Sequence, residues 1–166
     1  MRSVFISVFT VLLFTGCSYK HDTLYVSSKK TTEQGVANTK KTQIMQNGKI
    51  KIFVTVTYLD SLKVTKDIDK TKEQFVVGFH FVNFDSKSVE QKLSPKDIKF
   101  EIENQIHLLK VKKLKINSTL LKTVPASNPW SQYFLVQTPK IDKNVIKFSL
   151  KLKDYPKISL NFEKDY

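Results

Sequence analysis

The chain has 166 residues and a formal net charge of +13 at pH 7, from 28 Lys plus Arg against 15 Asp plus Glu. It contains one cysteine, which excludes an intramolecular disulfide, so apolar burial must hold the fold together. The basic residues are scattered rather than gathered in a stripe, and after Arg2 every one of them is a lysine. Arginine is the side chain suited to bidentate phosphate recognition, so its absence after Arg2 weakens any specific recognition of an anion. Because the lysines are scattered, we expect no nucleic-acid partner.

Residues 1–16 have the layout of a secretory signal peptide. Met1-Arg2-Ser3 is a short cationic start, and the run from Val4 to Phe14 is almost wholly apolar. This run has about eleven residues, whereas a helix that spans a bilayer needs roughly 20. We therefore expect residues 1–16 to direct export and then to be removed.

The end of this run, Phe14-Thr15-Gly16-Cys17, resembles the lipobox of bacterial lipoproteins, although Phe14 stands where Leu is usual. The resemblance implies that Cys17 is joined to diacylglycerol, becomes the first residue of the mature chain and carries an acyl chain such as palmitate. It also implies that the chain lies in the cell envelope, anchored to the membrane through Cys17. Ser18 stands where Asp would signal inner-membrane retention in many Gram-negative bacteria, which favours the outer membrane in such a cell. The alternative is an ordinary secretory signal that ends near a cysteine.

Residues 17–46 are predicted to form a flexible tether. They are rich in Ser, Thr, Lys and Gln and contain few large apolar side chains. Such a segment buries too little apolar surface to offset the entropy lost on ordering. Leu24-Tyr25-Val26 is the one short strand that we consider within it. The folded domain is therefore predicted to cover residues 47–166.

From Asn47-Gly48 onward, apolar and polar residues alternate in the way that is typical of half-buried strands. The segment 75–84 is apolar on both faces, which predicts a central strand, and Gly78 within it predicts a bulge or a close backbone approach. Asn104-Gln105 is expected to form a tight turn between two strands, and residues 94–97 a single helical turn. Strands are predicted over residues 50–58, 75–84, 98–103, 106–111, 115–124, 132–138, 145–153 and 157–163.

Seven or eight short strands without an amphipathic helix indicate an all-β antiparallel sandwich or barrel. The strand from Val76 to Asn83, followed by a polar loop and Leu93-Ser94-Pro95, is similar to a segment of immunoglobulin-like domains in secreted bacterial proteins. The resemblance implies an antiparallel immunoglobulin-like β-sandwich. The Cys-Trp-Cys hallmark of antibody domains is missing, since Cys17 and Trp130 are the only residues of their types.

The polar residues do not form a pattern that is typical of metal binding or nucleophilic catalysis. No two of His21, His80 and His107 are three or four positions apart, and none lies at ligand spacing from a carboxylate. The chain also lacks a Gly-x-Ser-x-Gly motif and a phosphate-binding glycine loop. We therefore predict no metal, no cofactor and no nucleophile.

Two pairs of carboxylates were considered for acid–base catalysis. Glu101 and Glu103 share one face of a predicted strand, and Asp67 and Asp69 lie in one predicted loop. Lysines flank both pairs and should lower the pKa values of these carboxyl groups, which weakens them as general acids. We therefore do not expect an enzyme.

The segment 123–133 is the first candidate contact site. Two prolines stiffen it, and Trp130 and Tyr133 are able to present aromatic faces to a sugar or a peptide. The alternative interpretation, which is the commoner outcome for large aromatic residues and the one that we favour, is that Trp130 covers the core beneath the loop.

The second candidate is the lysine-rich stretch formed by Lys110, Lys112, Lys113 and Lys115. Lysines on an edge strand commonly protect it against edge-to-edge aggregation, and this is the interpretation that we favour. The alternative is a patch that contacts anionic lipid or an anionic cell-wall polymer.

These observations predict a membrane-anchored envelope lipoprotein that acts as a non-catalytic binding or assembly module for an envelope complex. Its expected partner is another envelope protein, contacted through sheet edges or through the segments 60–72, 84–97 and 123–133. The tether would give that partner a high effective concentration. The alternative is a surface-exposed adhesin or ligand binder for carbohydrate or an anionic polymer.

Overall fold

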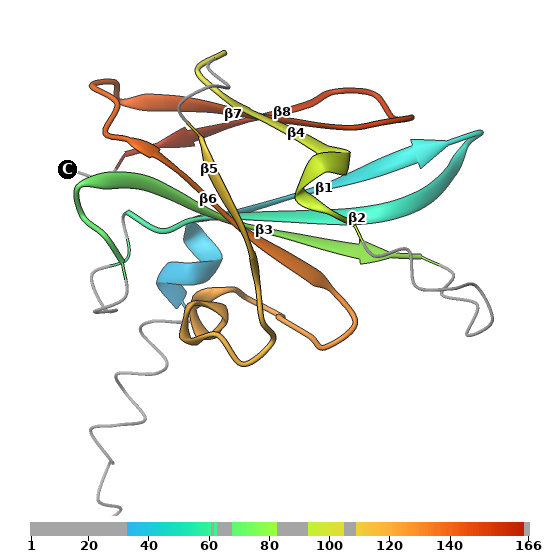
Figure 1. The fold of residues 1–166 in the computed structure, drawn as a ribbon, viewed down its shortest axis with the longest axis horizontal. Helices are drawn as coiled ribbons and strands as arrows, with labels where there is room; N and C mark the ends of the chain where they lie inside the picture. The colour runs from blue at the N-terminus through green and yellow to red at the C-terminus, as the bar shows by residue number, and fades with distance from the viewer. Residues whose placement is uncertain (1–32, 61, 63–67, 83–92, 105–108, 165–166) are drawn as a thin grey trace, which may run out of the picture.

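The structure, a computed structural model, describes residues 33–60, 62, 68–82, 93–104 and 109–164. Within these residues, eight strands form two antiparallel sheets that face each other (Figure 1), which confirms the all-β sandwich. No helix in the described part of the chain is long and apolar enough to cross a membrane. The strands are β1 (Thr39–Gln46), β2 (Lys49–Tyr58), β3 (Lys72–Phe81), β4 (Ile98–Ile102), β5 (Lys110–Leu114), β6 (Gln132–Pro139), β7 (Val145–Leu152) and β8 (Ile158–Glu163).

Several predictions fall on residues that the structure does not describe. They concern the signal peptide, the lipidation of Cys17, the strand at 24–26 and part of the loops 60–72 and 84–97. His21, Asp67 and His107 also lie outside the described residues.

The strand order is that of an immunoglobulin constant-type sandwich. One sheet has the order β1-β2-β3-β6-β5 and the other β4-β7-β8. The strand orders β2-β3-β6-β5 and β4-β7-β8 correspond to the orders A-B-E-D and C-F-G in that fold, and β1 is an additional edge strand. Antibody domains join strands B and F by a disulfide. Here Phe75 of β3 and Phe148 of β7 link the same two strands, with ring centroids 4.9 Å apart.

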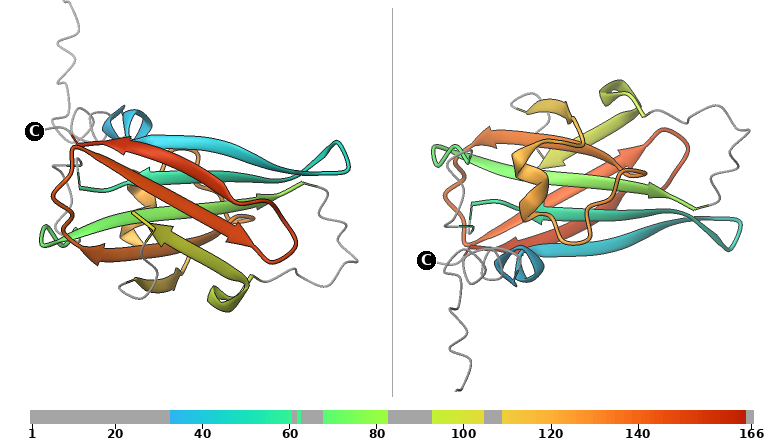
Figure 2. Two further views of the ribbon diagram at one scale, coloured as in Figure 1. Left: turned by 90° about the horizontal axis from the view of Figure 1, so that it is seen from above. Right: turned by 90° about the horizontal axis from the view of Figure 1, so that it is seen from below.

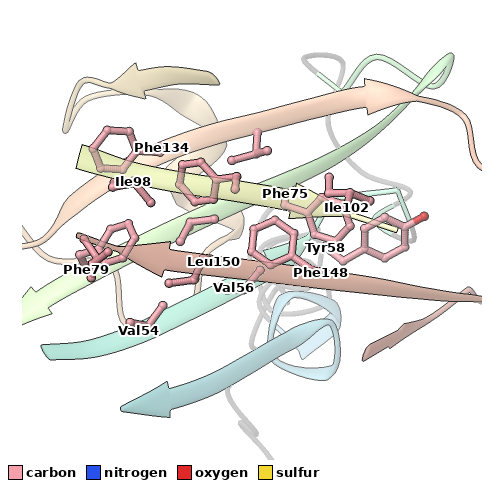
Figure 3. Close-up of a cluster of buried hydrophobic side chains, with 14 of the residues drawn as sticks. Val54, Val56, Tyr58, Phe75, Phe79, Ile98, Ile102, Phe134, Phe148 and Leu150 are labelled. Atoms are coloured by element: carbon pink, nitrogen blue, oxygen red, sulfur yellow. The ribbon is translucent and has the colours of Figure 1, made fainter. Parts of the chain in front are cut away.

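The main core lies between the two sheets (Figure 3), where the predicted alternation places apolar side chains from both sides. Val54, Val56 and Tyr58 of β2 are buried, and so are Phe148 and Leu150 of β7. The inward rows predicted for these strands are therefore confirmed.

A second apolar cluster covers the outer face of the five-stranded sheet. Val76 of β3 and Leu135 of β6 pack there against Leu120 and Leu121 of the 3-10 helix η2 (Thr119–Thr123), which lies under the sheet in Figure 1. Both faces of β3 are thus buried, as expected for a central strand. The strand predicted over 115–124 is wrong, because adjacent leucines and Val124 pack onto the sheet as one helical turn rather than by alternation.

Strand β1 corrects the predicted tether of residues 17–46. It pairs with β2 along its whole length, and residues 33–37 before it are helical, so the domain begins well before residue 47. An edge strand needs few apolar side chains, and Ile44 alone is buried in β1, which is why the segment resembles a tether in composition. Asn47 and Gly48 have φ values of 52° and 72° and form the two-residue hairpin turn that favours Asn-Gly.

The turn at Asn104 does not join a hairpin. β4 pairs with β7 and β5 pairs with β6, so the chain changes sheet between them, and β5 begins at Lys110 rather than at residue 106. Alternation predicts strands but cannot tell which sheet each one joins. The helical turn predicted at 94–97 is confirmed as the 3-10 helix η1 (Pro95–Asp97), where Asp97 accepts a hydrogen bond of 2.7 Å from the Ser94 N–H.

Candidate functional site

The two aromatic residues of the 123–133 segment have opposite environments. Trp130 is 72% exposed, so the interpretation that it covers the core is wrong. Tyr133 is 3% exposed and packs in the outer apolar cluster, so it does not present a free face beside Trp130. Tyr133 lies within β6, whereas Trp130 lies in the turn before it, which explains the difference.

Hydrogen bonds to one asparagine hold the turn that carries Trp130. Asn128 Oδ1 accepts from the backbone N–H of Trp130 at 3.1 Å and from that of Ser131 at 2.9 Å. It also accepts from the Ser131 hydroxyl at 3.0 Å. Pro129 occupies the second turn position, which its fixed φ suits. The turn is therefore preorganised with its tryptophan in solvent.

Tyr133 positions this turn from below. Its hydroxyl accepts a hydrogen bond of 2.9 Å from the backbone N–H of Asn128. Its ring lies against Gly78 so closely that a Cβ on Gly78 would be 2.8 Å from Tyr133 Cε1 and 2.6 Å from Thr55 Oγ1. The sequence predicts a bulge or a close backbone approach at Gly78. The structure instead brings the side chains of Tyr133 and Thr55 close to it, and the pairing of β3 continues through this position without a bulge.

A cavity of about 240 Å³ lies between this segment and the outer face of β1, β2 and β3. We call it the Gly78 groove. Thr55, Gly78 and Tyr133 lie side by side in its floor, as cross-strand neighbours. Ala126 and Asn128 form its wall. The groove therefore exists because the loop that precedes β6 passes over the outer face of β1, β2 and β3 next to Gly78.

One side of the groove is aromatic. Phe53 of β2 is 43% exposed, and its cross-strand neighbour is His80 of β3, with ring centroids 6.5 Å apart. His80 Nδ1 lies 3.5 Å from Ser131 Oγ in the wall. Ala126 has a φ of 54°, a left-handed conformation that costs a non-glycine residue about 1 kcal/mol and persists where neighbours fix it.

The groove is basic rather than acidic. Lys41 of β1 lines it, and none of the described residues that line it is Asp or Glu. Lys51 stands two residues before Phe53 in β2 and so belongs to the same face of the strand. The site can therefore offer an aromatic face, hydroxyl and amide groups, and a positive charge.

The four lysines predicted as a contact site lie elsewhere. All of them are exposed, and β5 is an edge strand of the five-stranded sheet, as the protective interpretation expects. Lys113 Nζ donates to Gln132 Oε1 at 2.8 Å and to the Leu93 carbonyl at 3.2 Å, and it lies 5.8 Å from the ring centroid of Phe134. Lys113 thus contributes to local packing. Contact of Lys110, Lys112 and Lys115 with an anionic surface stays a prediction.

A buried carboxylate that the sequence did not single out lies at one end of the sandwich. Glu73 of β3 is fully buried and accepts hydrogen bonds from Tyr58 OH at 2.5 Å, Lys164 Nζ at 2.7 Å and the Ile141 N–H at 3.1 Å. Burial raises the pKa of Tyr58 well above its usual value, and Glu73 adds to the shift. Because the three donors come from three different segments of the chain, the Glu73 carboxylate holds these segments together at this end of the sandwich.

The half-buried carboxylates Glu101, Glu103 and Asp69 have lowered pKa values, as predicted. A hydrogen bond from Lys157 lowers the pKa of Glu101, and one from Lys143 lowers that of Glu103. Hydrogen bonds from the neighbouring lysine and threonine lower the pKa of Asp69 to about 2. Among the described residues, no three His, Cys, Asp or Glu side chains lie together so as to hold a metal ion.

A comparison of the chain with models of protein families, with curated proteins and with solved structures finds no match.

Proposed function

We propose that the chain is a non-catalytic binding module of the cell envelope, tethered to the membrane by lipid on Cys17. The observation that carries this proposal is Trp130, which is 72% exposed on a turn that Asn128 holds beside the Gly78 groove. Rigid exposed aromatic side chains give large contact areas at a small entropic cost, and they are enriched at binding surfaces.

Two kinds of partner fit such a module. Met45 and Phe53 on the β1–β2 hairpin are 45% and 43% exposed, and exposed apolar side chains of this kind support docking of an envelope protein. Figure 2 shows that the tip of this hairpin extends beyond the end of β3. The Gly78 groove supports the other partner, a carbohydrate or anionic polymer. A concave site with a few converging polar groups suits a small ligand unit better than a flat protein surface, so we favour the second partner.

The experiment that tests the module is chemical crosslinking of the full-length protein in its native envelope. We expect material captured by the wild-type protein to be lost with Trp130→Ala. The matched control is Ile116→Ala, because Ile116 is also an exposed apolar residue, 54% accessible, in another loop. Circular dichroism should show the same fold for both variants. If Trp130→Ala captures the same material as wild type, Trp130 is not part of a binding surface.

The anchor is tested separately with Cys17→Ala. We expect this variant to leave the membrane fraction and to lose labelling by a palmitate analogue, because the lipid is attached at this residue. Membrane retention of Cys17→Ala with unchanged labelling would contradict a lipid anchor at Cys17.

A further inference from the structure

We propose that the Gly78 groove binds one ring of an anionic sugar polymer, with the ring stacked on Phe53 and its acidic group near Lys41. This rests on the proposed function and adds the chemical class of the ligand. Trp130, on the turn that forms the groove wall, would provide an aromatic face for a neighbouring ring of the same polymer.

The side chains of the groove match the two kinds of surface that a sugar has. A sugar ring carries C–H groups with partial positive charge, which suit the negative face of an aromatic ring such as Phe53. It also carries hydroxyl groups, and Thr55 and Ser131 offer hydroxyls of their own along the groove. Phe53 is 43% exposed, so its ring is accessible for stacking.

The backbone in the groove argues against an extended peptide as the ligand. The floor is the face of a sheet, where β2 is paired with both β1 and β3, and β3 with both β2 and β6. Extended peptides are commonly recognised through main-chain hydrogen bonds at a free strand edge. The floor of the groove offers no free strand edge, which suits a ligand recognised through its ring faces and hydroxyl groups.

The size of the groove suits one ring at a time. Its volume of about 240 Å³ is below the range of roughly 300–1,000 Å³ that is common for sites enclosing a drug-sized ligand. A longer chain would have to continue over the neighbouring surface, where Trp130 lies on the groove wall side and the β1–β2 hairpin on the other. The site is therefore suited to a repeating polymer.

The positive charge around the groove favours an anionic polymer over a neutral one. Lys41 lines the groove, Lys51 lies on the same strand face as Phe53, and none of the described lining residues is an acid. The whole chain carries a net charge of +13, which attracts an anionic polymer at long range.

The test uses two matched pairs of probes with the full-length protein, purified in detergent. Oligogalacturonate and its methyl ester differ in the carboxylate, and dextran sulfate and dextran differ in the sulfate, so the two pairs distinguish the two sources of charge. Poly-L-glutamate supplies negative charge without sugar. Trp130 is the only tryptophan and is exposed, so its fluorescence reports binding directly. Calorimetry gives the affinity of variants that lack it.

We expect at least one anionic sugar to bind and its neutral partner to bind at least about tenfold more weakly. Phe53→Ala and Trp130→Ala should each weaken binding about tenfold, as loss of a stacking face does elsewhere. Lys41→Gln should weaken binding about fivefold and reduce its salt dependence. Lys151→Gln removes an exposed lysine of β7 in the other sheet, so it is the matched control and should change neither the affinity nor its salt dependence.

Three results would overturn the proposal. Equal binding of an anionic sugar and its neutral partner would show that charge is not recognised. Binding of poly-L-glutamate as tight as that of the sugars, unaffected by Phe53→Ala, would indicate a non-specific charged patch. Binding of none of the probes would exclude this ligand class, while capture of an envelope protein through Trp130 in the crosslinking experiment would leave the binding module intact.

Discussion

Gly78→Ala tests how the fold holds the candidate site. In a strand without close neighbours, alanine in place of glycine gains about 0.5–1 kcal/mol, because glycine loses more backbone entropy on folding. Here the added Cβ would lie 2.8 Å from Tyr133 Cε1 and 2.6 Å from Thr55 Oγ1. Thr55 can rotate, but the Tyr133 ring is only 3% exposed and packs in the outer apolar cluster, and overpacking of this kind costs about 1–3 kcal/mol. We therefore expect a net loss of about 1–2 kcal/mol in the free energy of unfolding.

The same substitution should reach Trp130 through Tyr133. A displaced Tyr133 ring would move its hydroxyl from the Asn128 N–H, which it now contacts at 2.9 Å, and would loosen the turn. Urea unfolding followed by circular dichroism measures the stability, and fluorescence anisotropy of Trp130 measures the mobility of the turn. Tyr133→Phe is the matched variant, because it removes the hydroxyl without adding a Cβ and should lower the anisotropy at a smaller cost in stability. If Gly78→Ala is more stable than wild type and its anisotropy is unchanged, the close approach does not position the turn.

Three further predictions concern the rest of the fold. Glu73→Leu should cost about 3–5 kcal/mol in urea unfolding, because it removes the carboxylate that accepts from Tyr58 and Lys164 and leaves the Lys164 charge without this partner. Adding Lys164→Met should restore part of this loss, and a cost of Glu73→Leu below about 1 kcal/mol would contradict the role of Glu73 in joining these segments. Because the pKa of Tyr58 is raised in the folded state, the stability that its protonated hydroxyl contributes is complete below pH 10 and falls by about 1.4 kcal/mol per pH unit above it. The free energy of unfolding of Tyr58→Phe should therefore decrease less steeply with pH above 10 than that of the wild type, and equal slopes would refute this. Gly48→Ala should cost about 1–2 kcal/mol, since φ is 72° there, and an unchanged midpoint would mean that the β1–β2 hairpin contributes nothing to stability.

Alternation of apolar residues predicted the strands whose side chains do most of the packing. β2, β7 and β8 were located to within a few residues, because each buries one face between the sheets and so repeats an apolar residue at every second position. β3 was recognised as central because both of its faces are apolar. β1 was missed, since a strand that buries Ile44 alone has almost no pattern to detect.

The turn that carries Trp130 was predictable in part. Asn128 followed by Pro129 is a turn signal, because the asparagine side chain can accept from the backbone N–H groups two and three residues later, as it does here. The general tendency of large aromatic residues to be buried argued the other way and was wrong for Trp130. Local turn chemistry was the better guide at this position, since the residues on either side fix the direction of the chain.

The Gly78 groove was beyond sequence reasoning because no single segment contains it. Phe53 and His80 become neighbours only through the register of β2 against β3, and Asn128 reaches them only because β6 pairs on the other side of β3. The sequence indicated one residue of the groove, Gly78, because a glycine within an apolar strand marks a position that other atoms approach closely. That glycine now has a physical role. Without a side chain at this position, the Tyr133 ring can come close to β3, and its hydroxyl can accept from the Asn128 N–H in the turn that carries Trp130. The binding surface that we propose therefore depends on the close contact between Gly78 and Tyr133, and a substitution at Gly78 should impair binding by displacing Tyr133 and the turn that it holds.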